Sequence, residues 1–249
     1  MEARSLVAAA PYLIDQRYED YSAEEQDVWR TLVARRRSQL EAHACREYLS
    51  GYELIGLQDD RLPDLAAISD RLMSRTGWRS TPVSGFLPAE AFFEMLAARM
   101  FPTTTWLRSR NSLEYTPEPD IFHDVFGHVP MHAQPVFAAF LASYGSACAQ
   151  IKSAEALELL GRLFWYTVEF GLIRERGKIK VYGSGVISSH SECTNVIQGG
   201  CEVRDFDLLD VLATPVRINQ IQNVLFVVES FDQVYEAMHE AKNFVLESC

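Results

Sequence analysis

The stretch PDIFHDVFGHVP, residues 119–130, places two histidines five positions apart, and imidazole pairs of this kind can bind a transition metal. On an ideal α-helix residues i and i+4 share a face, whereas i+5 lies about 140° away around the axis. His123 and His128 therefore converge on one ion only if the helix loosens. Gly127 and Pro130 favour this, because glycine weakens a turn and proline cannot continue the hydrogen-bond ladder. We expect His128 at a distorted helix end, turned back towards His123.

The histidine pair alone is ambiguous, since each ring could satisfy a local hydrogen bond, but a carboxylate in an apolar segment supplies a third ligand. Glu169 is the only acidic or basic residue between Arg162 and Arg174. A buried anion without a partner costs several kcal/mol, and no lysine or arginine lies within one helical turn to pair with it. Two imidazoles and one carboxylate form the facial triad of non-haem Fe(II) enzymes. Zinc stays an alternative, because the same three ligands occur in hydrolytic zinc sites.

The elements that must position these residues are mainly helical. Ser22 and Glu25 have the spacing of a capping box and open a helix with apolar residues on one face. Helical periodicity predicts further helices over residues 63–75, 88–100, 135–151, 153–177 and 231–246. Strand signals are few and cover residues 178–182 and 223–228. With no repeat or long linker, the pattern favours a single mainly α domain with a few short β-strands.

Composition limits the function classes further. The chain has 249 residues, 48% of them hydrophobic, which is enough for a substantial core, and a net charge of −11, which disfavours binding to nucleic acid or anionic lipid. The first apolar stretch is short and contains Pro11, so we expect neither a secretory signal nor a membrane span. Five cysteines without a C-x-x-C pair are typical of reduced thiols in a cytoplasmic protein. A thiol site at Cys193 and Cys201 is a minor alternative.

Three stretches, YTPEPDIFHDVFGHVP, WYTVEFGL and YGSGVISS, resemble the central motifs of the pterin-dependent aromatic amino acid hydroxylases, most closely the short bacterial phenylalanine hydroxylases. The resemblance runs from about residue 22 to about residue 244. It implies a helical basket with iron(II) at the bottom. A tetrahydropterin and the substrate amino acid would bind beside the iron, and the tetrahydropterin would be tetrahydrobiopterin or a related pterin. Residues 22–249 are then a single catalytic domain, and residues 1–21 form an N-terminal extension. With no extended helix after the last predicted one, we expect a monomer.

The resemblance also assigns roles to residues. It makes His123, His128 and Glu169 the iron ligands and the catalytic centre. It implies that Arg108 holds the substrate carboxylate, for which a guanidinium fork is suited; without the resemblance, Arg108 would be interpreted as a solvated surface charge. The remaining residues of the substrate site are Thr116, Pro119, Trp165 and Ser188, the last as a support for a ligand histidine. The pterin site comprises Gly85, Phe86, Leu87, Phe92, which would stack on the pterin, and Asp124, which could instead support the ligands.

The expected reaction is hydroxylation of L-phenylalanine to L-tyrosine with O2 and the tetrahydropterin. Val216 and Asn219 depart from the family pattern, so the resemblance does not define one wall of the substrate pocket. Tryptophan 5-hydroxylation and phenylalanine 3-hydroxylation therefore stay as alternatives. A different class is an HD-type metal-dependent phosphohydrolase built on His123 and Asp124, which would need cationic residues near the metal. A third is a non-catalytic domain that the metal stabilises.

Overall fold

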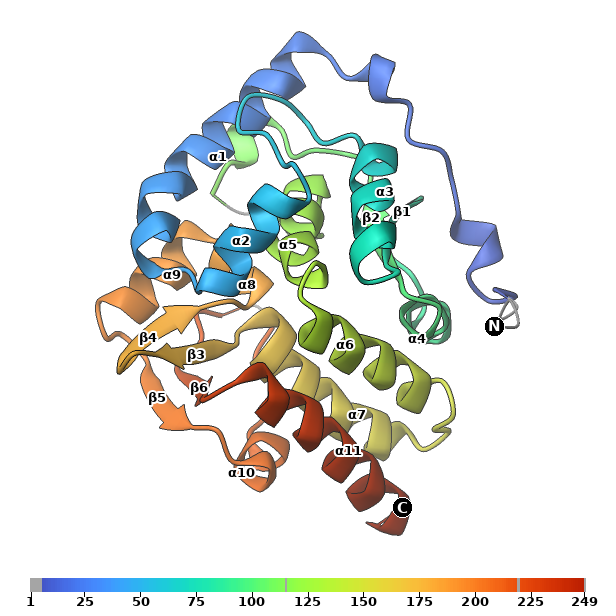
Figure 1. Cartoon of the computed structure of the whole chain (residues 1–249), viewed down its shortest axis with the longest axis vertical. Helices are drawn as coiled ribbons and strands as arrows, with labels where there is room; N and C mark the ends of the chain where they lie inside the picture. Colours follow the sequence, from blue (N-terminus) through green and yellow to red (C-terminus); the bar gives the residue numbers. More distant parts are fainter. Residues whose placement is uncertain (1–5, 115, 219, 249) are drawn as a thin grey trace.

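The computed structural model of the chain describes residues 6–114, 116–218 and 220–248. The described residues form eleven α-helices and two small sheets (Figure 1). The helices are α1 Ala23–His43, α2 Arg46–Leu54, α3 Leu65–Arg75, α4 Ala89–Ala97, α5 Val129–His132, α6 Pro135–Cys148, α7 Ala154–Phe164, α8 Ser184–Ser188, α9 His190–Ile197, α10 Leu208–Ala213 and α11 Phe231–Ser248. Two π-helices, Phe122–His128 and Trp165–Glu169, interrupt this set.

The strands form one pair and one four-stranded sheet. They are β1 Arg79–Val83, β2 Met100–Thr104, β3 Leu172–Glu175, β4 Lys178–Val181, β5 Glu202–Asp205 and β6 Val224–Val228. Strands β1 and β2 pair in parallel, with Arg79 opposite Met100 and Val83 opposite Thr104. The second sheet has the order β4-β3-β6-β5 and lies at the left of Figure 1, beside α8 and α9. The sheets therefore cover only parts of a helical body.

The first helix begins where the sequence predicts. The Ser22 hydroxyl accepts a hydrogen bond of 3.2 Å from the backbone N–H of Glu25, and the Glu25 carboxylate accepts one of 2.8 Å from the backbone N–H of Ser22. This reciprocal capping box satisfies two N–H groups that the helix itself leaves unpaired. Helix α1 buries Val28, Trp29, Leu32 and Val33 against the main core.

The helix predicted over residues 153–177 is wrong beyond Glu169. The chain leaves the helix at Phe170 and continues as β3, which pairs antiparallel with β4. Gly177, predicted as the helix end, lies in the hairpin turn with a φ of 77°. Leu172 and Ile173 are buried as strand residues, and a short apolar run does not separate a strand from a helix by periodicity.

The central helices enclose the core. Helix α6 packs against α4 on one side and α11 on the other, and α11 also contacts α7 (Figure 1). A second, smaller apolar cluster joins the N-terminal segment to α4 through Ala9, Val83, Leu87, Ala91 and Met95. None of the helices in the described ranges is long and apolar enough to cross a membrane.

Candidate metal centre

The two histidines of the opening motif lie on the π-helix Phe122–His128. In a π-helix the hydrogen bonds run from residue i to i+5, so residues five apart lie nearer to a common face than they do in an α-helix. The Nε2 atoms of His123 and His128 face each other at 3.2 Å. The structure thus brings the rings together, but not at a helix end: α5 continues the helix beyond His128, with Pro130 as its second residue. The widening extends through the whole segment between the histidines.

Gly127 allows another element to approach this π-helix. A Cβ atom on Gly127 would lie 3.1 Å from both the Cβ and the carbonyl oxygen of Ser184, the first residue of α8. Such contacts are tighter than most side chains make, so α8 packs here because residue 127 has no side chain. The role of Gly127 is therefore partly to let α8 lie against the histidine segment.

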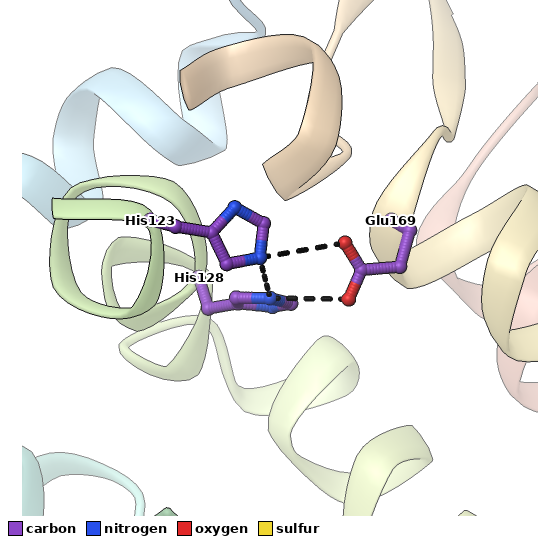
Figure 2. A group of neighbouring side chains, drawn as sticks. All are labelled: His123, His128 and Glu169. Carbon is purple, nitrogen blue, oxygen red and sulfur yellow. Dashed lines mark hydrogen bonds and ion pairs between the residues drawn. The ribbon is translucent and has the colours of Figure 1, made fainter. Parts of the chain in front are cut away.

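Glu169 reaches the histidines from the second π-helix, Trp165–Glu169. Its Oε1 lies 3.2 Å from His128 Nε2, and its Oε2 lies 3.7 Å from His123 Nε2 (Figure 2). One nitrogen or oxygen atom from each of the three residues lies within 4.8 Å of the others. Two imidazole nitrogens and one carboxylate oxygen facing a common point suit a single divalent ion. The three side chains therefore fit a mononuclear metal.

The protonation states of the site favour a metal as well. Burial raises the pKa of the Glu169 carboxyl, but the attraction of His128, the hydrogen bond from that ring and the charge of His123 outweigh it and hold the pKa at about 2. Burial lowers the pKa of His123 to about 4, although Glu169 opposes the shift. Near pH 7 the carboxylate is ionised and His123 is neutral, which are the forms that bind metals.

Two serines of α8 support the ligand side chains from outside. Ser188 Oγ lies 2.9 Å from Nδ1 of His123, which leaves Nε2 facing the centre. Ser184 Oγ donates a hydrogen bond of 2.8 Å to Oε2 of Glu169. Outer hydrogen bonds of this kind orient ligands and fix the tautomer of a histidine. Ser188 was among the predicted residues, whereas Ser184 was not, because only its place in YGSG marks it in the sequence.

Arg108 is not a solvated surface charge. Its side chain is 7% exposed, and its Nε and Nη2 atoms donate hydrogen bonds of 2.7 Å each to the two carboxylate oxygens of Asp120. Asp120 is fully buried and also accepts a bond of 3.1 Å from the backbone N–H of His123. Sequence reasoning missed Asp120 as a partner, although it stands three residues before the first histidine.

A cavity of about 400 Å³ opens above the three candidate ligands. Of the residues predicted for the pterin and substrate sites, it is lined by Gly85, Phe86, Leu87, Phe92, Pro119 and Asp124. The lining residues that were not predicted as site residues include Trp106, Glu118 and Phe164. Among the described lining residues none is a lysine or an arginine, so the cavity offers no cation for a phosphate group. Its walls suit a flat aromatic molecule instead.

Four predicted residues lie outside the lining of this cavity: Arg108, Thr116, Trp165 and Ser188. Thr116 Oγ1 donates to the carbonyl of Glu118 at 3.1 Å. Trp165 Nε1 donates to Gln222 Oε1 at 3.1 Å. Ser188 lines a smaller pocket of about 230 Å³, on the side of His123 away from the metal-facing nitrogen. Asn219 lies outside the described residues.

Asp124 faces the cavity with its carboxylate tied to the neighbouring strand. Its Oδ2 accepts hydrogen bonds of 2.8 Å from both the backbone N–H and the hydroxyl of Thr104. Burial raises the pKa of the Asp124 carboxyl to about 7, and the bonds from Thr104 only partly offset this. The group thus borders the cavity and is anchored by β2, which fits either of its two predicted roles.

Comparison with known proteins identifies the class. A two-histidine, one-glutamate centre in a helical architecture is typical of mononuclear non-haem iron oxygenases. The chain belongs to the biopterin-dependent aromatic amino acid hydroxylase family, whose profile matches residues 13–247. The predicted family is confirmed. The predicted fold class, a helical basket with a few short strands, is confirmed as well.

Bacterial enzymes are among the similar proteins. The chain is 42% identical to phenylalanine-4-hydroxylase of Chromobacterium violaceum over 92% of this chain and 77% of that protein. It is 43% identical to the Mesorhizobium japonicum phenylalanine-4-hydroxylase, over 94% of this chain and 86% of that protein. The crystal structure of the C. violaceum enzyme with bound oxidised Fe(III) superposes with a TM-score of 0.90, at 40% identity, over 94% of this chain and 86% of that one. Another structure of that enzyme holds iron(III) and 7,8-dihydrobiopterin.

Proposed function

We propose that this chain is a phenylalanine 4-monooxygenase, which converts L-phenylalanine to L-tyrosine with O2 and a tetrahydropterin at one non-haem Fe(II). The observation that carries the proposal is the placement of three metal-ligand atoms, all within 4.8 Å, at an aromatic cavity of about 400 Å³. The named relatives at 42% and 43% identity support the choice of phenylalanine.

His123, His128 and Glu169 would hold the iron. When bound, ferrous iron and the reduced pterin supply the electrons and the activation of dioxygen from which one oxygen atom enters the ring. The chain's contribution is to place the reactants and to exclude water. Phe101 packs on the His128 ring, with centroids 4.7 Å apart, and lines the cavity beside it. It keeps the imidazole in position and the surroundings of the centre apolar.

The flat walls of the cavity suit the pterin. Phe92 lines the cavity and meets Phe164 edge to face, with ring centroids 5.8 Å apart. Edge contact of this kind fixes the Phe92 ring while leaving a face for stacking. The loop of Gly85, Phe86 and Leu87 would cover the pterin from the solvent side, where Phe86 is 82% exposed.

Arg108 would bind the carboxylate of the amino acid. Asp120 takes the Nε and Nη2 edge of the guanidinium, and the fork then presents Nη1 for an incoming anion. Trp165, held by Gln222, and Thr116 would complete the substrate site with Pro119 and Ser188. The substrate site therefore combines the cavity with residues beside it.

We further propose that the enzyme works as a cytoplasmic monomer on free amino acid, without nucleic acid or membrane as a partner. The described cysteines Cys45, Cys148, Cys193 and Cys201 are all free thiols, which suits a reducing compartment. Neither Cys193 nor Cys201 belongs to a group of three or more metal-ligand side chains among the described residues. Light scattering of the purified protein tests the monomer.

Product identification tests the function. Purified protein is incubated with ferrous iron, 6-methyltetrahydropterin and, in turn, phenylalanine, tyrosine and tryptophan. We expect para-tyrosine from phenylalanine, dependent on both iron and pterin, and little product from the other two amino acids. Meta-tyrosine or 5-hydroxytryptophan as the main product would replace the proposed reaction by an alternative of the same family. Iron-loaded protein that forms no hydroxylated amino acid would overturn the proposal.

A further inference from the structure

Helix α8 contacts two of the three candidate ligands. Its first and last residues, Ser184 and Ser188, are four apart and lie on one face. Ser184 bonds Glu169 at 2.8 Å, and Ser188 lies 2.9 Å from the His123 ring. The helix also packs against both π-helices that carry the ligands. A single five-residue element thus connects ligands that are 46 positions apart in the chain.

The position of Ser184 is fixed from several sides. Its side chain is almost fully buried, at 1% exposure. Gly127 gives it room on the histidine side, as described above. On the other side, a Cβ on Gly183 would lie 2.5 Å from the carbonyl oxygen of Glu169, so the chain before α8 runs directly along the glutamate backbone. The hydroxyl therefore has little freedom to move away from the carboxylate.

The hydrogen bond distinguishes the two oxygens of Glu169. Oε2 accepts from Ser184, whereas Oε1 faces His128 Nε2 at 3.2 Å. Among the described residues, Ser184 is the one side chain other than the two histidines that bonds this carboxylate. A carboxylate can bind a metal through one oxygen or through both. A donor on Oε2 competes with a metal for that oxygen, so Oε1 would be the stronger ligand atom.

We propose that Ser184 is a positioning residue, which holds the Glu169 carboxylate towards the metal and favours its binding through one oxygen. The inference rests on the proposed metal centre and adds to it a residue outside the ligand set. Its role is distinct from that of Ser188, because the two serines act on different ligands.

The test uses Ser184→Ala in metal-free protein titrated with Co(II), which reports on coordination through its visible absorption. We expect Co(II) to bind roughly 10- to 100-fold more weakly than in wild type, the usual effect of removing an outer hydrogen bond to a ligand. The Co(II) absorption should change in position or intensity as the carboxylate binds in another way. Ser184→Thr retains the hydroxyl and should restore the wild-type affinity.

A matched control separates positioning from folding. Ser80 is 2% exposed and bonds the Thr103 hydroxyl at 2.7 Å, away from the ligands. Ser80→Ala loses a buried hydroxyl in the same way and should bind Co(II) like wild type. Urea unfolding of the metal-free variants checks that the two substitutions cost similar stability.

Two outcomes count against the inference. Co(II) affinity and absorption of Ser184→Ala equal to wild type would overturn it and leave the metal centre standing. Wild-type protein that binds no Co(II) would instead overturn the metal centre, and the role of Ser184 with it.

Discussion

Arg108 and Asp120, twelve residues apart, form an ion pair with two hydrogen bonds of 2.7 Å and side-chain exposures of 7% and 0%. The same carboxylate accepts the backbone N–H of His123 at 3.1 Å. The proposed substrate-binding arginine and the first candidate iron ligand therefore share one anchor. A substitution of Asp120 should therefore affect the positions of both Arg108 and His123.

Asp120→Asn leaves the buried guanidinium without a compensating charge. Breaking a buried pair in this way typically costs about 3–5 kcal/mol, and we expect a loss of unfolding free energy of about 3 kcal/mol together with a higher KM for phenylalanine. Urea denaturation measures the first and steady-state kinetics the second. The control is Glu114→Gln, which breaks the exposed pair with Arg35 and should cost under about 1 kcal/mol. Equal losses in the two variants would show that the buried pair has no special weight.

His132 is a buried histidine with neither ring nitrogen bonded to any described residue. Its ring stacks on Trp78 at 4.8 Å, and burial lowers its pKa well below 6.5. As pH falls below about 6.5, an unfolded chain takes up a proton that the folded chain refuses, so wild type loses stability.

His132→Phe keeps the aromatic stack and removes the two unpaired nitrogens. We expect the variant to equal or exceed wild type in stability, by about 1 kcal/mol at pH 8 and by more at pH 5. Urea unfolding of metal-free protein at both pH values provides the measurement. A parallel pH dependence in the two proteins would contradict the assigned neutral state of His132.

Asp124 titrates in the opposite sense. Its pKa of about 7 in the folded chain lies above the ordinary value of 3.8, so the folded chain binds the proton more tightly. This stabilisation is present at low pH and is lost as pH rises from about 4 to about 7. Asp124→Asn can still accept the bonds from Thr104 but cannot ionise. In metal-free protein we expect the variant to gain stability relative to wild type between pH 5 and pH 7.5. No relative gain over that interval would refute the raised pKa.

The N-terminal segment braces the cavity loop. The Glu94 carboxylate of α4 accepts the backbone N–H groups of Val7 and Ala9 at 3.0 and 2.8 Å. The backbone N–H of Ser84, next to the cavity residue Gly85, donates to the carbonyl of Tyr12 at 2.9 Å. Residues 6–14 are thus attached to the loop proposed to cover the pterin.

Glu94→Ala removes both acceptors for the N-terminal segment. Bonds to a charged group contribute about 1.5–3 kcal/mol each, so amide exchange of residues 7–9 should accelerate by roughly tenfold or more. The KM for the pterin should rise while Co(II) affinity stays unchanged. Glu90→Ala, in the first turn of the same helix, is the control. Exchange rates that match those of the control would contradict a bracing role.

The three candidate ligands could be predicted because the patterns that mark them lie within short stretches of the sequence. A histidine pair beside glycine and proline, and one carboxylate in an apolar segment, are visible without knowledge of the fold. The π-helix could not be predicted in this way, because the choice between i+4 and i+5 hydrogen bonds depends on tertiary packing, here that of α8 against Gly127. The sequence therefore predicted that the two histidine rings converge, but not that a π-helix brings them together.

Features that depend on contacts between segments far apart in the sequence could not be predicted. The parallel pairing of β1 with β2 joins segments on either side of α4. Strand β3 replaced the end of a predicted helix because Leu172 and Ile173 fit both patterns, whereas its partner β4 was predicted as a strand. The bond from Ser184 to Glu169 likewise depends on tertiary packing. A serine gives no sequence signal of the acceptor it will meet.

The central claim is that His123, His128 and Glu169 bind one ferrous ion from one side. Anaerobic equilibrium dialysis of wild type, His123→Ala, His128→Ala and Glu169→Ala against Fe(II), followed by metal analysis, tests it most directly. We predict one iron per wild-type chain and loss of most of it in each variant, with far-ultraviolet circular dichroism unchanged. Variants that retain one tightly bound iron per chain would contradict the claim.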